Sequence, residues 1–141
     1  MAAWRRATGG SHRIDHLAAQ RVAGRLVVML SRFIGIGSRL EVFGPGVVPI
    51  DATSRLEPDV LAAGLDPAAD NWLACRTRLL AVEVSGPGSR LIDETYKRDA
   101  YLAAGVREVW LVDLERRHVA VARSGVPDEV LRDQVQWQAQ D

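Results

Sequence analysis

This 141-residue sequence has little cysteine, no net charge and no long apolar run, and each of these absences excludes a class of protein. The single cysteine, Cys75, excludes an internal disulfide framework and is typical of a reducing compartment, so we expect a cytoplasmic protein. The 18 basic and 18 acidic residues cancel, so any nucleic-acid binding must come from a local patch. Long apolar runs are also missing, because residues 26–36 are too few to span a bilayer and include Arg32. We therefore expect no membrane partner.

The composition that remains is that of a globular protein. Hydrophobic residues make up 48% of the chain and charged residues 26%, and the length suits one domain better than two. No internal repeat or linker divides the sequence, so we expect a single domain over residues 1–141.

Two helices and several strands can be read from the apolar spacing. Helical spacing predicts helices over residues 13–33, after a candidate capping Ser11, and over residues 91–104, ending at Gly105. Short apolar runs bounded by glycine and proline predict strands at 38–43, 47–50, 56–63, 77–85, 106–113 and 118–123, of which the first two are expected to form a hairpin. The tail from residue 124 onward favours helix but has no clear place in the core. The order predicts an α/β or α+β fold with a mixed central sheet flanked by helices.

One residue does not fit its predicted strand. Glu83 lies between Val82 and Val84 in a run that otherwise has the composition of a buried core strand. An isolated buried carboxylate is too costly to keep unless it is paired or binds a metal. Glu83 is therefore the first candidate for a functional residue.

Further charged residues can join Glu83. Asp59 begins one predicted strand, and Asp93, Lys97 and Tyr101 follow one another at helical spacing on one face of the second helix. If the two strands are neighbours, Asp59 and Glu83 can hold a hard divalent cation, since carboxylate oxygens and water suit Mg²⁺ or Mn²⁺. A lysine beside such a cation is typical of phosphodiester hydrolysis.

Each of these candidate residues also has a purely structural interpretation. Asp93 and Lys97 can be a solvated helix pair, and Asp59 can cap a strand entry. His12, at the entry to the first helix, suits a polar cap or surface position as well as a supporting role. Glu83 can also pair with Lys97 as a buried ion pair without any catalysis.

The segments LEPDVLAAG and LLAVEVSGPGSRLIDETYKRDAYLAAGVREVWLVD resemble the Uma-two family of restriction-endonuclease-like proteins, a branch of the PD-(D/E)XK nuclease superfamily. The matching elements run in order: Pro58-Asp59, Glu83-Val84-Ser85, the helix with Asp93, Lys97 and Tyr101, and Gly105 followed by EVWLVD. The resemblance covers about residues 11–123 and implies a restriction-endonuclease-like core there, with a peripheral tail after it.

The resemblance also implies roles for these residues. Asp59 and Glu83, helped by the backbone carbonyl of Val84, would coordinate Mg²⁺, with Mn²⁺ as a substitute. Where the superfamily has its lysine, this chain has Ser85, and Lys97 on the helix would replace that lysine. Members of the family usually carry an N-terminal acidic hairpin and a final strand and helix, so this chain is interpreted as a shortened, fragmentary or decayed member.

The resulting hypothesis is a metal-dependent endonuclease that hydrolyses the phosphodiester bonds of DNA. Asp93, Tyr101 and His12 would support the site, and Arg90 and Arg98 would contact phosphates. An inactive nucleic-acid-binding or protein-interaction module on the same scaffold is the alternative. Cutting both strands of a duplex would favour a homodimer by symmetry. The sequence leaves open which DNA is recognised and whether RNA is cut instead.

Overall fold

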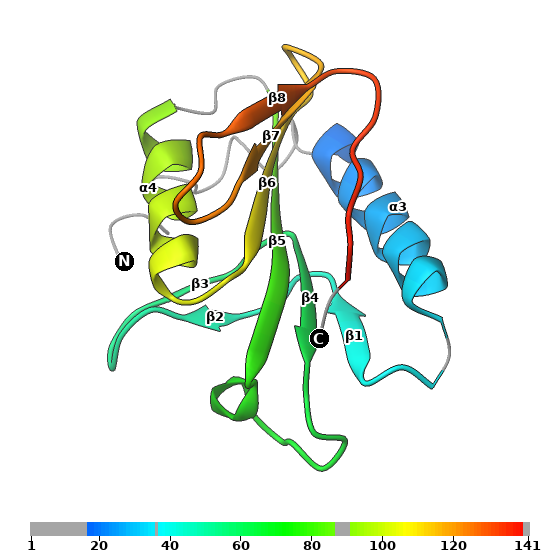
Figure 1. Cartoon of the computed structure of the whole chain (residues 1–141), viewed down its shortest axis with the longest axis vertical. Coiled ribbons are helices and arrows are strands. Elements are labelled where there is room, and N and C mark those ends of the chain that lie inside the picture. Colours follow the sequence, from blue (N-terminus) through cyan, green and yellow to red (C-terminus); the bar gives the residue numbers. More distant parts are fainter. Residues whose placement is uncertain (1–16, 36, 87–90, 140–141) are drawn as a thin grey trace.

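The computed structural model describes residues 17–35, 37–86 and 91–139, with the side chains of residues 91 and 92 left out (Figure 1). Its elements are α3 (Leu17–Ile34), β1 (Leu40–Phe43), β2 (Val48–Pro49), β3 (Arg55–Leu56), β4 (Val60–Gly64), η1 (Trp72–Ala74), β5 (Thr77–Ser85), α4 (Leu91–Ala103), β6 (Glu108–Asp113), β7 (His118–Ala122) and β8 (Glu129–Leu131). In these ranges neither α-helix is both long and apolar enough to cross a membrane.

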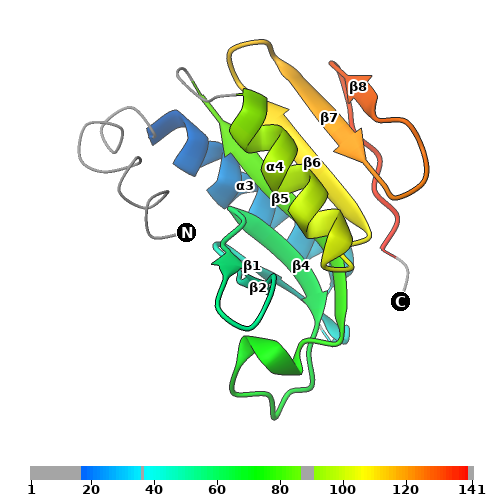
Figure 2. The same ribbon diagram turned by 90° about the vertical axis from the view of Figure 1, so that its left-hand side faces the viewer.

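Six strands form the main sheet in the order β1-β4-β5-β6-β7-β8. The pair β5·β6 is parallel and every other neighbouring pair is antiparallel, so the predicted mixed sheet is confirmed. The parallel pair needs a crossover, and α4 supplies it. The helices α3 and α4 cover opposite faces of the sheet (Figures 1 and 2).

Side chains of β4 and β5 alternate between two cores because successive strand residues point to opposite faces. Leu61 and Ala81 belong to the cluster on the α4 side, together with Tyr101 of that helix. Val60 and Val82 belong to the cluster on the α3 side. The burial of both faces explains why β5 has a nearly continuous apolar sequence.

The predicted hairpin between the first two strands is wrong. β1 pairs with β4, and β2 pairs with β3 in a separate two-stranded sheet. The predicted strand over residues 56–63 is also divided between β3 and β4, with Pro58 at the break. Proline has no N–H for a sheet ladder, and the Pro58 carbonyl instead accepts a hydrogen bond from the Gly46 N–H at 3.2 Å. Asp59 therefore stands where the chain passes from the small sheet into the main one.

The C-terminal tail was expected to favour helix and to have no clear place in the core, and the structure differs. β8 pairs with β7 at the edge of the main sheet. Val135 and Trp137 of the following segment pack against the core on the α3 side, and the Trp137 ring lies 5.9 Å from that of Phe33, centroid to centroid. Strand pairing and apolar burial override the local helix preference.

Candidate active site

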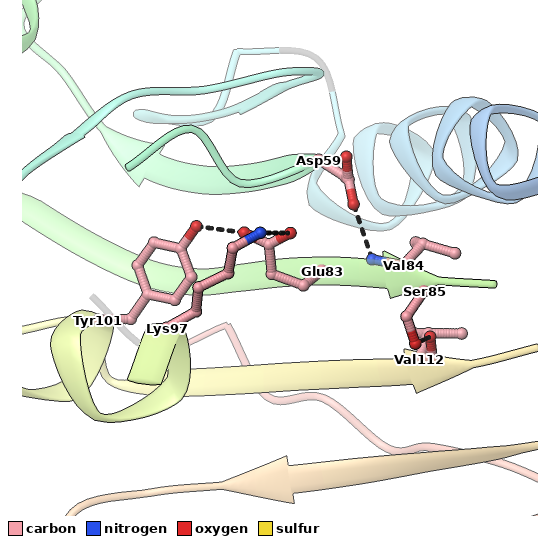
Figure 3. A network of polar contacts seen from close by, with 7 residues as sticks. All are labelled: Asp59, Glu83, Val84, Ser85, Lys97, Tyr101 and Val112. Carbon is pink, nitrogen blue, oxygen red and sulfur yellow. Dashed lines mark hydrogen bonds and ion pairs between the residues drawn. The ribbon is translucent and has the colours of Figure 1, made fainter. Parts of the chain in front are cut away.

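Asp59 and Glu83 come from neighbouring strands and lie opposite each other. β4 and β5 are antiparallel, with Val60 paired to Val82 and Leu61 to Ala81. Continuing this register by one residue brings Asp59 opposite Glu83, with both side chains on the α4 face of the sheet. From the sequence, these two carboxylates were expected to meet if their strands are neighbours. The structure shows that the strands are neighbours (Figure 3).

The Asp59 carboxylate also takes the place of a missing backbone partner. Its Oδ2 accepts a hydrogen bond from the Val84 N–H at 2.7 Å, just beyond the end of the β4·β5 ladder. The backbone of the next residue, Ser85, faces the β6 side, since its carbonyl accepts a hydrogen bond from the Leu114 N–H at 3.1 Å. The N–H and C=O of one strand residue point to the same edge, so the Val84 carbonyl faces the Asp59 side. A backbone carbonyl in this position could join Asp59 in binding a metal ion.

Glu83 is held by two residues of α4. Lys97 Nζ lies 3.3 Å from Oε2, and the Tyr101 hydroxyl donates a hydrogen bond to Oε1. Lys97 and Tyr101 are four residues apart, so one face of the helix presents both groups to the strand. The Lys97 and Glu83 side chains are only 16% and 12% exposed, and Tyr101 is fully buried. The expected convergence of Glu83, Lys97 and Tyr101 is therefore present in the structure.

Burial controls the electrostatics of this group. Removal from water raises the pKa of Glu83 from 4.5 to about 7, because the charged form loses its hydration. Lys97 lowers that pKa, Asp59 raises it, and the Tyr101 hydrogen bond lowers it again. Burial, followed by the charge of Glu83, raises the pKa of Tyr101 as well, so its hydroxyl remains a proton donor. Glu83 thus changes charge near neutral pH.

The donor set fits a divalent cation of the Mg²⁺ class. The described parts of the chain hold no group of three or more histidine, cysteine, aspartate or glutamate side chains that could bind a metal. Mg²⁺ does not require such a cage, since it retains several waters and commonly binds through one or two carboxylates. Two opposed carboxylates and a backbone carbonyl provide hard oxygen donors of this kind. The negative charge of Asp59 raises the pKa of Glu83, although by less than Lys97 lowers it, so the two carboxylates repel each other.

The other residues predicted for the site are Asp93, Arg98, His12 and Arg90. Asp93 is exposed, one helical turn before Lys97. Arg98 is held on the same helix by ion pairs with Asp99 and Asp128. The expectations for His12 and Arg90 fall outside the described residues.

Ser85 stands two residues after Glu83, at the position for which the sequence resemblance implied a lysine in related proteins. Its hydroxyl donates a hydrogen bond to the Val112 carbonyl of β6 at 3.2 Å. It supplies no cation to the site, so the positive charge near Glu83 comes from Lys97 on α4.

Sequence reasoning gave no role to Glu57. This exposed residue lies 3.6 Å from the Arg55 guanidinium, yet its charge also acts on Tyr101 and raises the pKa of that hydroxyl. Its position two residues before Asp59 was the available signal, because alternate residues of an extended segment point to the same side. A third carboxylate therefore contributes to the negative field at this edge of the sheet.

Comparisons with known proteins bear on the family and the fold of this chain. A family model, Uma2, described as “Putative restriction endonuclease”, matches residues 15–141. A crystal structure described as a “putative nuclease” from Anabaena variabilis superposes with a TM-score of 0.67 at 16% sequence identity, over 79% of this chain and 65% of that protein. The chain thus spans somewhat less than two thirds of that relative's length, and at this identity the likeness shows the fold. No curated protein matches the chain at a significant level.

Proposed function

The chain belongs to the Uma2 family, described as “Putative restriction endonuclease”, and from this premise we propose that it is a metal-dependent endonuclease that hydrolyses phosphodiester bonds in DNA. The observation that carries the proposal is the meeting of Lys97 with Glu83 at 3.3 Å, on the face of the sheet where Glu83 stands opposite Asp59. Two carboxylates and an ammonium group are the charges that this chemistry needs.

In this proposal the carboxylates and the Val84 carbonyl hold the metal. Asp59 and Glu83 would bind Mg²⁺, with Mn²⁺ as a substitute, and such an ion would lower the pKa of a water and neutralise charge on the phosphate. Asp59 is positioned for this by its hydrogen bond to the Val84 N–H. Tyr101 fixes one oxygen of Glu83 and so orients its carboxylate.

Lys97 acts as the electrostatic catalyst. Its ammonium is a mobile point charge on a flexible stem, so it can move from Glu83 to a phosphate oxygen and stabilise the negative charge that develops there. Asp93 would support Lys97 from one turn earlier on the helix, and His12, Arg90 and Arg98 remain proposed supporting or phosphate-contacting residues. The proposal also includes a cytoplasmic location and a homodimer that cuts both strands of a duplex.

A plasmid-nicking assay with Mg²⁺, Mn²⁺ or EDTA tests the proposal. We expect metal-dependent cleavage by the wild type and a loss of about a hundredfold or more in the Glu83→Gln and Lys97→Ala variants. Arg76→Gln, which changes an exposed arginine near the start of β5, is the matched control and should cleave as the wild type does. Unchanged metal-dependent cleavage by Glu83→Gln would contradict the assignment of this site.

One observation favours a second function, an inactive nucleic-acid-binding module. Glu83 already has Lys97 and Tyr101 as partners, so the structure offsets its charge without any metal. A folded wild type that binds DNA equally well with Mg²⁺ and with EDTA, and nicks none of it, would support this alternative.

A further inference from the structure

The outer surface of α3 carries three arginines in one stripe. Arg21, Arg25 and Arg32 are all exposed, and the helix contains neither aspartate nor glutamate. At about 100° of rotation per residue, the three side chains leave the helix within an arc of about 40°. The buried residues Ala19 and Leu30 lie on the side that faces the sheet. We call Arg21, Arg25 and Arg32 the α3 basic stripe.

Within the described residues, the stripe lacks the carboxylate partners that some other arginines have. Several arginines elsewhere are held by carboxylates, namely Arg55 by Glu57, Arg98 by Asp128, Arg116 by Asp113 and Arg123 by Glu108. Over residues 17–35, 37–86 and 91–139, no ion pair engages an arginine of the stripe. In a chain whose formal charges sum to zero, α3 is therefore a local concentration of positive charge without an ion-paired acid among the described residues.

The helix lies against the part of the chain that carries the candidate site. Gly44 fits tightly between α3 and the start of β4, since a Cβ there would lie 2.7 Å from Val27 Cγ2 and 3.4 Å from the Asp59 carbonyl oxygen. The N-terminal half of α3 runs beside the end of β5 that follows Glu83 (Figures 1 and 3). The N-terminal half of the stripe thus lies at the same end of the sheet as Asp59 and Glu83, while α3 and the two carboxylates lie on opposite faces of the sheet.

We propose that Arg21, Arg25 and Arg32 form a contact surface for the phosphate backbone of a duplex nucleic-acid substrate. The inference rests on the proposed nuclease function and names the residues that position its substrate. At about 1.5 Å of rise per residue, the three attachment points lie about 6 Å and 10.5 Å apart along the helix. Phosphates of one DNA strand are spaced by ~3.4 Å along the duplex axis, so these separations correspond to about two and about three phosphate steps. Guanidinium groups suit phosphate through paired N–H donors.

Salt-dependent binding of a fluorescein-labelled 20-base-pair DNA duplex, measured by anisotropy in EDTA so that no cleavage occurs, tests the proposal. Each phosphate contact contributes about 0.9 to the slope of log K against log[salt]. We expect Arg21→Gln/Arg25→Gln to reduce the slope by about 1.8, and the further change Arg32→Gln by about 0.9 more. The Arg21→Lys/Arg25→Lys variant retains the charges and should keep the wild-type slope. Circular dichroism and thermal melting verify that each variant is folded.

The matched control is Arg76→Gln/Arg107→Gln, which removes two exposed charges at the opposite end of β5 and β6 and should leave the slope unchanged. Equal slopes for the wild type and the folded stripe variants would overturn the inference, as would no binding of the duplex by the wild type. Stripe-dependent binding to phosphatidylserine vesicles without an effect on duplex binding would also overturn it and would point to a membrane surface. Stripe-dependent duplex binding without Mg²⁺-dependent cleavage would support the inference and contradict the proposed activity instead.

Discussion

At the scale of single residues, the site is a balance of charges around Glu83. Burial opposes its ionisation, while Lys97 and the Tyr101 hydroxyl favour it. The sequence indicated this conflict, because a glutamate interrupted an apolar strand. It could not give the partners' geometry, since that depends on how α4 crosses over the sheet.

The raised pKa of Glu83 predicts a pH-dependent cost in stability. Because the pKa rises from 4.5 to about 7, the folded state favours the protonated carboxyl. The stability that the protonated carboxyl contributes is fully present below pH 4.5 and is lost as the pH rises through 7. The free energy of unfolding falls by roughly 3 kcal/mol over this range. Glu83→Gln does not titrate, so it should unfold at higher urea than the wild type at pH 8 and at similar urea at pH 4. A stability difference between the two proteins that stays constant with pH would refute this explanation.

Tyr101 should act as a positioning residue. Tyr101→Phe keeps the buried ring but removes the hydrogen bond that stabilises ionised Glu83. We expect cleavage to fall about tenfold and the acid limb of its pH profile to move to higher pH, because the pKa of Glu83 rises further. Tyr96→Phe is the matched control, since this tyrosine is 58% exposed on the same helix. A profile unchanged in position for Tyr101→Phe would show that the hydroxyl does not act through Glu83.

At the scale of elements, the parts with strong local signals were predicted best. The predicted strand 77–85 coincides with β5, and the predicted helix 91–104 ends one residue after α4 does. The glycine break and the apolar spacing mark both elements within a few residues of sequence. The pairing of β1 with β4, rather than with β2, depends on long-range burial, which no local turn pattern encodes.

Gly46 shows how the small sheet is joined to the site. Its N–H bonds to the Pro58 carbonyl beside Asp59, and an added Cβ would lie 2.4 Å from Leu61 Cβ. Gly46→Ala should therefore lower the free energy of unfolding by about 1–3 kcal/mol, measured by urea denaturation, and should reduce cleavage by displacing Asp59. Gly24→Ala is the control, because a Cβ added at this position would have nothing within 4 Å and because alanine has a higher helix propensity than glycine. Equal stability of the Gly46→Ala variant and the wild type would refute this tight contact.

At the scale of the whole molecule, the candidate site lies where three parts of the fold meet. The small sheet ends at Asp59, the central strand supplies Glu83, and the crossover helix supplies Lys97. Sequence spacing placed Lys97 and Tyr101 on one helix face, and it brought Asp59 and Glu83 together only on the condition that their strands are neighbours, which β4 and β5 are. The effect of Glu57 on Tyr101, and the lack of ion pairs at Arg21, Arg25 and Arg32 among the described residues, required the tertiary structure, because both depend on which charges lie nearby in space.

Direct titration of the purified protein with Mn²⁺ by calorimetry tests most sharply whether Asp59 and Glu83 form a metal site. We predict one bound ion per chain in the wild type, no binding by Glu83→Gln, and binding at least as tight in Lys97→Ala, since Lys97 competes with the ion for Glu83. With a Glu83 pKa of about 7, binding at pH 7 should also release about half a proton per ion, seen by comparing two buffers. Equal Mn²⁺ binding by the wild type and Glu83→Gln, or none by the folded wild type, would contradict the metal site.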